Sequence, residues 1–404
     1  MREMTGRERV AAALEHKEPD LVPIDFGATR STGINALAYR ELLDYLNIEE
    51  EEEVKVFDFK QLLAEPGEQI SRMFGSDCIA LHRLAPSAGV QIDEYRRERL
   101  MDGKEYLVPK GFCPEEQKDG SSLLIVNGVP ILKRPADGLY FDDCYHPLEE
   151  TVNELGDYPL PGTSEKELLY LKERARDLRE NTDKAIVAST GISIFEKGIK
   201  DWGYEEFLVR IYTEPELVKS YLEQLTEAYL QFLDLYLEAV GPYTNIFQCN
   251  DDLGMQTSTL IFPQVYRKVF KPYHKKIYSY IKERVPGSHI LLHSCGSIYD
   301  LIPDLIETGV DALNPVQINA EKMDPGTLKR EFGRDITFWG GGCSTQTTLS
   351  FGTLEEIEDE TKRMIETFAP GGGFVFNQVH NIQSNVSPQR IIKLYETAKR
   401  YRKL

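Results

Sequence analysis

The chain has 404 residues, and its 47 Lys and Arg against 66 Asp and Glu give a net charge of −19 at pH 7. This acidic balance argues against a nucleic acid as partner, and no run of about 18 apolar residues predicts a membrane span. Hydrophobic residues make up 41% and charged residues 28%, which is typical of a soluble globular enzyme. The first residues lack an apolar signal segment, and six widely spaced cysteines are typical of free thiols or metal ligands. We therefore expect a cytoplasmic protein.

The N-terminal part predicts a helix and two strands. Thr5 to Glu8 fits a capping box at the start of a helix that ends near Leu14. A short apolar strand at 22–27 leads into a polar turn that contains Arg30, and a second strand at 77–83 ends in His82 and Arg83.

The segment 85–160, which we call the insert, has a different character. Its Asp102-Gly103 and Asn127-Gly128 pairs lie between β-prone runs, a strong indication of hairpins. We interpret the insert as antiparallel strands over the mouth of the main fold, where such a region acts as a lid or shapes specificity. Surface decoration without a role is the alternative.

After Pro161 the pattern alternates strand and helix to the end of the chain. With the two earlier strands this makes eight, beginning near residues 22, 77, 185, 245, 289, 311, 335 and 373. Eight apolar strands, most of them separated by helical stretches, predict a (β/α)8 TIM barrel. We expect residues 1–404 to form this single barrel, with the insert inside its N-terminal third.

Polar side chains follow nearly every strand, at the end where barrels carry their active sites. His293 and Cys295 share one face of a strand because side chains two apart point the same way. Together they supply half of a tetrahedral zinc site, although a buried Cys beside a hydrogen-bonded His is the simpler interpretation. Cys343 directly follows the three glycines 340–342, after the strand expected near 335, and is our candidate third ligand.

Four further residues are expected to line the mouth: Arg30, His82, Asp251 and Gln378. Arg30 would hold an anionic group. Of the neighbours Asp251 and Asp252, one is expected to cap the following turn and the other to act as a general base or to anchor a histidine.

Several motifs resemble the uroporphyrinogen decarboxylase superfamily, a family of (β/α)8 barrels. They are the run from Cys249 to Gln256, the His293-Ser294-Cys295-Gly296 run, the Asp311 to Gln317 run and the closing Gly371 to Gln383 run. The resemblance covers most of the chain and is weakest across the insert. True decarboxylases carry an arginine-rich stretch after the first strand and an Asp after the second. Here the first place has only Arg30, and the second reads Leu81-His82-Arg83-Leu84.

The other branch contains zinc-dependent methyltransferases of corrinoid systems, marked by His-x-Cys and a later Cys. His293 and Cys295 match this motif, whereas the position of the later Cys is occupied by His380, which the decarboxylases share. The resemblance offers His380 as third ligand in place of Cys343, which is our own inference from its place after a strand. His380 can also close the fourth position. The absence of a metal is the remaining alternative.

Taken together, these features lead us to expect an enzyme, a zinc-dependent methyltransferase that activates a thiol or similar acceptor in a corrinoid-linked system. A cobamide would come on a separate corrinoid-binding protein, and the substrate would be a small molecule. Two alternatives remain: a metal-free decarboxylase acting on a tetrapyrrole or small acid, and a non-catalytic subunit that docks a corrinoid protein.

Overall fold

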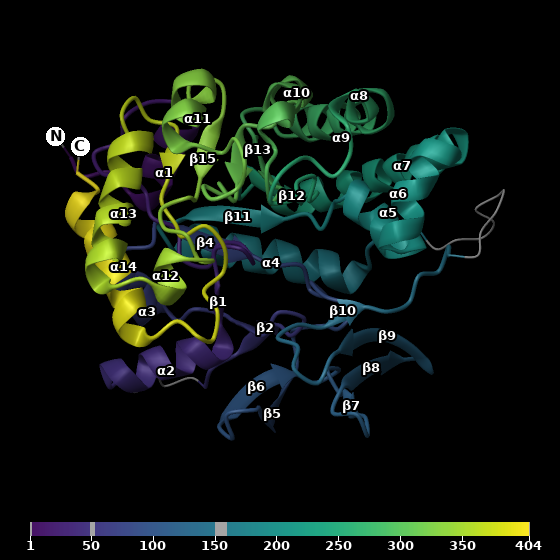
Figure 1. The fold of residues 1–404 in the computed structure, drawn as a ribbon, viewed down its shortest axis with the longest axis horizontal. Helices are drawn as coiled ribbons and strands as arrows, with labels where there is room; N and C mark the ends of the chain where they lie inside the picture. The colour runs from purple at the N-terminus through teal and green to yellow at the C-terminus, as the bar shows by residue number, and fades with distance from the viewer. Residues whose placement is uncertain (1, 49–52, 150–159, 404) are drawn as a thin grey trace.

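The computed structural model describes residues 2–48, 53–149 and 160–403, and a curved parallel sheet lies at its centre (Figure 1). Seven strands pair side by side in chain order from β4 to β16. They are β4 (Cys78–Leu81), β11 (Ala185–Ser189), β12 (Ile246–Asn250), β13 (His289–His293), β14 (Ala312–Asn314), β15 (Thr337–Trp339) and β16 (Phe374–Val375).

The residues around Ile24 fill the eighth position between β16 and β4. Ile24 forms a parallel bridge with Phe376, and its carbonyl accepts the N–H of Asp77 at 2.7 Å. The protein is therefore a (β/α)8 barrel whose first strand is reduced to a single bridge. Seven of the expected strands are confirmed, and the expected first strand is present as this single bridge.

Helices surround the sheet and connect its strands (Figure 1). They are α1 (Gly6–Leu14), α2 (Ala36–Leu46), α3 (Glu68–Phe74), α4 (Glu165–Asn181), α5 (Phe195–Trp202), α6 (Tyr204–Thr213), α7 (Pro215–Val240), α8 (Pro263–Val265), the π-helix η1 (Tyr266–Phe270), α9 (Lys271–Arg284), the 3-10 helix η2 (Tyr299–Leu301), α10 (Ile302–Thr308), α11 (Pro325–Phe332), α12 (Thr348–Phe351), α13 (Leu354–Phe368) and α14 (Pro388–Tyr401). The capping box at Thr5 is confirmed. The stretch after Gly203 forms two helices, α6 and α7, because Pro215 lacks an N–H and begins a new helix. No helix in the described ranges is long and apolar enough to cross a membrane.

The barrel has one apolar cluster inside its sheet and a larger outer one, in which the surrounding helices pack. The inner cluster contains one or two side chains from every strand of the sheet and is closed at its N-terminal end by Val10, Ala13 and Leu14 of α1. The strand members are Cys78, Ala185, Val187, Ile246, Leu291, Ala312, Trp339 and Val375. Each such fully buried large apolar side chain stabilises the fold by about 1.5–3 kcal/mol relative to an exposed one. Because side chains alternate along a strand, this layer also identifies the inward positions further up the barrel.

The insert forms antiparallel strands, as expected. β5 (Tyr95–Arg99) pairs with β6 (Glu105–Pro109), and a second sheet runs in the order β10, β9, β8, β7. Its strands are β7 (Glu115–Glu116), β8 (Ser122–Val126), β9 (Val129–Arg134) and β10 (Asp142–Asp143). Asn127 and Gly128 both have positive φ, at 52° and 79°, which is the geometry of a tight hairpin turn. Residues 150–159 of the insert lie outside the described residues.

A small sheet that the sequence did not predict joins the insert to the barrel. Its order is β1 (Ile34–Asn35), β3 (Leu63–Ala64), β2 (Val56–Asp58), and Lys55 forms a bridge with Leu107 of the insert.

Candidate metal centre

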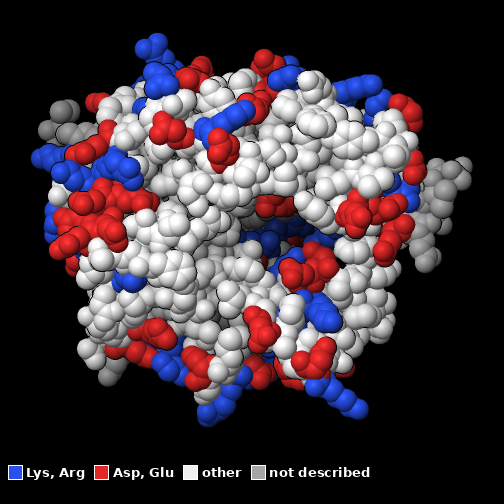
Figure 2. All heavy atoms as spheres, viewed as in Figure 1, with Lys and Arg blue, Asp and Glu red and all other residues white. Residues whose placement is uncertain are grey.

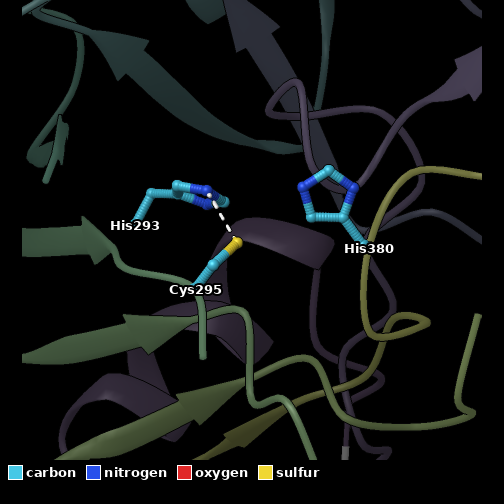
Figure 3. A group of neighbouring side chains, drawn as sticks. All are labelled: His293, Cys295 and His380. Atoms are coloured by element: carbon cyan, nitrogen blue, oxygen red, sulfur yellow. Dashed lines mark hydrogen bonds between the residues drawn. The ribbon is translucent and has the colours of Figure 1, made fainter. Parts of the chain in front are cut away.

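The end of β13 delivers His293 and, two residues later, Cys295 to the same space, which His380 enters from the segment after β16 (Figure 3). The ligand atoms of these three residues all lie within 4.8 Å of one another. His293 Nε2 is 3.5 Å from Cys295 Sγ, and the two imidazole ring centres are 5.9 Å apart. This is the one group in the described part of the chain in which three such residues come together in a geometry that could hold a metal ion.

The ring of His293 is oriented by Asn314 at the end of β14. Asn314 Nδ2 donates to the carbonyl of Trp339 at 2.9 Å, so its Oδ1 faces the other way and lies 3.1 Å from His293 Nδ1. Ser31 also donates to this oxygen. We therefore assign the proton of His293 to Nδ1, which leaves the Nε2 lone pair facing Cys295.

Asn381 orients His380 in the same way. Its Nδ2 donates to Gln61 Oε1 at 2.9 Å, and its Oδ1 lies 3.0 Å from His380 Nδ1. The Nε2 atoms of both imidazoles are thus free to bind a ligand. An amide oxygen on Nδ1 is the arrangement that supports a metal-binding histidine.

The protonation states of this group suit a cation. Burial, and then the neighbouring His293, lower the pKa of His380 to about 4, so its imidazole is neutral at pH 7. Burial, and then the carboxylates of Asp252 and Glu196, raise the pKa of the Cys295 thiol well above its usual range. A thiolate here therefore requires a positive charge at the sulfur, which a bound metal ion would supply.

Zinc fits the donor set. A tetrahedral ion with bonds of ~2.0–2.3 Å holds its ligand atoms ~3.3–3.8 Å apart. His293 Nε2 and Cys295 Sγ already lie at 3.5 Å, and His380, whose ligand atom lies within 4.8 Å of both, is the candidate third ligand. Two imidazole ligands and one thiolate would leave a fourth position open, as in catalytic zinc sites.

Two carboxyl groups border this site. Asp252 Oδ1 accepts the backbone N–H of Cys295 at 2.7 Å and lies 3.5 Å from His293 Nε2. Glu196, the second residue of α5, lies beside it, and burial and the two nearby aspartates raise its pKa to about 8. Glu196 was not among the predicted site residues, and Asp252 was considered only as the alternative to Asp251. Strand alternation could have identified Asp252, because Asn250, two residues before it, is paired in register with His293.

Asp251 points away from the mouth, which corrects its expected place among the lining residues. Its side chain is 1% exposed and accepts the N–H groups of residues 194, 195 and 196 at 2.8–2.9 Å, together with His274 Nε2 at 2.7 Å. Asp251 thus caps the start of α5 and anchors a buried histidine. It therefore serves as the histidine anchor that the sequence suggested for one of the two aspartates, and the capping role falls at α5 rather than at the turn near Gly254.

The structure does not bring Cys343 into the metal group. The thiol packs in the outer apolar cluster beside Thr361 and Glu360 of α13, and burial raises its pKa well above the usual range. The side chain of Trp339 points into the barrel, and if side chains continued to alternate as in a strand, Cys343, four residues later, would also point inward. Gly340 and Gly341 have φ of 115° and 80°, however, and this left-handed backbone breaks the alternation.

Gln378 is also turned outward and is fully buried, so it does not line the mouth as expected. Its amide donates to the carbonyl of Thr32 at 3.2 Å and accepts the hydroxyl of Tyr395 at 2.7 Å. It lies three residues beyond the inward Val375 and therefore has the opposite orientation.

Arg30 and His82 do lie together, next to the insert. Arg30 Nε is 2.5 Å from Asp58, and its Nη2 donates to Ser87 Oγ at 2.8 Å. His82 stacks on Phe57 with ring centres 4.0 Å apart. Burial, and then the charge of Arg30, lower the pKa of His82 to about 3, so this ring is neutral at pH 7.

A barrel with imidazoles, a thiol and carboxyl groups at the C-terminal ends of its strands has the arrangement of a barrel enzyme. The family model for uroporphyrinogen decarboxylase (URO-D) matches residues 147–401. The chain therefore belongs to the uroporphyrinogen decarboxylase family.

Individual relatives are distant. The uroporphyrinogen decarboxylase of Shewanella halifaxensis is 24% identical over 285 residues, which cover 66% of this chain and 75% of that protein. That of Geotalea uraniireducens is 26% identical over 206 residues, which cover 50% and 54%. Among solved structures, a methyltransferase from Methanosarcina mazei superposes with a TM-score of 0.61 at 18% identity and covers 99% of both chains. This last likeness shows a shared fold.

Proposed function

We propose that this protein is a zinc-dependent methyltransferase of a corrinoid-linked system, in which a small thiol is the methyl acceptor. The single observation that carries the proposal is the group of His293, Cys295 and His380, whose ligand atoms lie within 4.8 Å of one another at the mouth of the barrel. The fold it shares with a methyltransferase is compatible with this reaction.

The chain's own residues would hold and orient the reacting thiol. Bound zinc supplies a Lewis acid that lowers the pKa of a thiol placed in its open position. Asn314 and Asn381 bind the Nδ1 atoms of His293 and His380, which leaves the Nε2 atoms of both rings for the metal. Asp252 fixes the backbone at Cys295 and lies where it can accept the proton that the incoming thiol loses.

A separate corrinoid-binding protein would bring the methyl group to this mouth on a cobamide. The thiolate sulfur then forms the new bond to the methyl carbon, and the pair of electrons of the broken cobalt–carbon bond stays on cobalt. The insert borders the same mouth, and we propose that it forms the lid of a single barrel domain. As a lid it would exclude water from the reacting sulfur.

A metal-free decarboxylase is the second candidate, because the curated relatives carry that name. An octa-acid substrate needs several free guanidinium groups at the mouth. Here Arg30 is paired with Asp58, and Arg83 is held by both oxygens of Glu167 at 2.5 and 2.8 Å. This pairing favours the methyltransferase.

The first test is the metal content of protein purified without chelator. We expect about one zinc per chain in the wild type and less than a tenth of that in Cys295→Ser and His380→Ala. Cys343→Ser is the matched control, since it removes a thiol that contacts α13 and should keep full occupancy. Full occupancy in His380→Ala, or loss in Cys343→Ser, would contradict the proposed ligand set.

The second test is turnover. Methylcobalamin and a small thiol are mixed with the zinc-loaded protein, and the loss of the methyl–cobalt absorbance is followed. Transfer that depends on Cys295 supports the methyltransferase. Cobamide binding without transfer would instead support a non-catalytic docking subunit. If the wild-type protein is stable when purified and contains no metal, the decarboxylase is supported.

A further inference from the structure

A cavity of about 310 Å³ lies at the end of the barrel where the strands begin. Its walls come from α1, the last turn of α4, the first residues of β11 and β12, and the loop that joins α7 to β12. Figure 1 shows α1 at this end of the sheet. The hollow that Figure 2 shows near the middle of one face, between the sheet and the insert, is a different place. The metal centre also lies elsewhere, where the same strands end.

Most of the residues around this cavity are apolar. Arg7, Ala11 and Leu14 line it from α1, and their spacing of four and three residues places them on one face of that helix. Ile186 and Ile246, at the start of β11 and β12, add two buried apolar side chains. An apolar cavity of about 150 Å³ can hold a benzene ring. A cavity of about 310 Å³ therefore has room for an aryl or short alkyl group together with a polar head.

Two arginines, Arg7 and Arg179, supply the charged part of the wall. Arg7 Nη2 lies 3.5 Å from the carbonyl oxygen of Arg179 and donates to the carbonyl of Thr182 at 2.9 Å. Its Nε donates to the carbonyl of Lys184 at 3.3 Å. These bonds satisfy carbonyl groups at the C-terminal end of α4. They leave Nη1 of Arg7 without a partner among the residues that the structure describes, so this nitrogen can still donate to a ligand.

The charges around the two arginines do not balance. Burial, and then the charge of Arg179, lower the pKa of Arg7, whereas the carboxylate of Asp183 raises it. Within the described ranges, no carboxylate forms an ion pair with either arginine. The next cation, Lys184, is already paired with Glu68 at 3.5 Å. Two guanidinium groups with a single carboxylate nearby leave an excess positive charge at the cavity.

We propose that this cavity binds a small monocarboxylate with a compact apolar body. The carboxylate binds Arg7 Nη1 and the guanidinium of Arg179, since planar guanidinium groups match the two oxygens of a carboxylate. The apolar body lies against Leu14, Ile186 and Ile246. Barrel enzymes carry their reacting groups at the opposite end of the strands. The bound acid is therefore a second ligand and not the reactant, and its site does not depend on the function proposed above.

Binding of two matched probes tests the site. We would titrate the full chain with phenylacetate and with the neutral 2-phenylethanol by calorimetry, once with zinc and once after treatment with a chelator. We expect phenylacetate to bind at one site per chain and at least tenfold more tightly than 2-phenylethanol, with and without zinc. The absence of saturable phenylacetate binding, equal affinities for both probes, or binding that requires zinc would overturn the proposal.

A pair of arginine substitutions assigns the binding to this cavity. Arg179→Met keeps the length of the side chain but removes its charge, and we expect it to weaken phenylacetate binding at least fivefold. Arg176→Met is the matched control, because this exposed arginine lies one turn earlier on α4 and does not line the cavity. Its affinity should stay within about twofold of the wild type. An unchanged affinity in Arg179→Met, or an equal loss in Arg176→Met, would refute the assignment.

Thermal unfolding gives a second readout that needs no activity. A compound that binds only the folded chain at a hundred times its dissociation constant should raise Tm by about 3 °C for 404 residues. Ala11→Leu places extra methyl groups in the cavity, so phenylacetate should no longer raise its Tm. A full shift in Ala11→Leu would show that phenylacetate binds elsewhere. Arg179 is exposed, so Arg179→Met keeps the fold and decides the question if Ala11→Leu does not fold.

Discussion

Replacing Asp251 or its neighbour Asp252 by Asn should separate fold stability from site chemistry. The carboxylate of Asp251 is 1% exposed and accepts four hydrogen bonds, three of them from the start of α5 and one from His274. In Asp251→Asn, Oδ1 can still accept two backbone N–H groups. The new amide nitrogen, however, faces the N–H of Ile194 and can no longer accept it.

The magnitude follows from the bonds that are lost. A hydrogen bond to a charged group contributes ~1.5–3 kcal/mol, and an unsatisfied buried donor costs ~1–3 kcal/mol. We therefore expect Asp251→Asn to lower the free energy of unfolding by about 3–5 kcal/mol. With an unfolding entropy of about 2.1 cal/mol/K per residue, a chain of 404 residues loses about 1.2 °C of Tm per kcal/mol, or about 4–6 °C here.

Asp252→Asn is the matched substitution. Its side chain is 39% exposed, and the Asn oxygen can still accept the N–H of Cys295. We expect a Tm within about 1 °C of wild type and a zinc affinity lowered about tenfold or more, because an anion beside two ligands is lost.

Thermal unfolding followed by circular dichroism, together with zinc competition against a chromophoric chelator, measures both quantities. If Asp252→Asn lowered Tm as much as Asp251→Asn, the opposite orientations of the two side chains would be refuted.

Three further outcomes follow from the same contacts. Asn314→Ala should lower zinc affinity about 10–100-fold in the chelator assay, because it releases the ring of His293, whereas an unchanged affinity would refute this orienting role. Acidification from pH 7 to pH 5 should destabilise the metal-free protein by up to about 2 kcal/mol through His82, whose pKa of about 3 lies below its usual value of about 6.5, so that the unfolded state binds the proton first. His82→Phe should lose that much less over the same range of pH, and parallel Tm curves for both proteins would contradict this. Gln378→Ala should lower Tm by about 2–4 °C without changing zinc content, since it leaves Tyr395 without its buried partner, and a loss of zinc would place Gln378 at the site after all.

Much of the fold is already determined by local sequence patterns. Apolar strands separated by helical stretches predicted the barrel and all eight strand positions, and Asn127-Gly128 predicted its hairpin, because these features depend on periodicity and turn chemistry within a few residues. His293 and Cys295 were predicted to share a face for the same reason.

The rest of the site depends on contacts between distant segments. His380 meets His293 at the barrel mouth although β14 and β15 lie between β16 and β13 in the sheet, because the curved barrel brings the ends of distant strands together. The left-handed backbone at Gly340 and Gly341, in contrast, turns Cys343 away. Which of Asp251 and Asp252 faces the site also depends on the tertiary structure, because α5 and His274 supply the hydrogen-bond donors that hold Asp251 away from it. Lys60, in the turn after β2, and Asp143, at the end of β10, likewise form an ion pair at 2.5 Å although they are far apart in the sequence. No local pattern brings them together, because they meet only when the insert folds against the barrel.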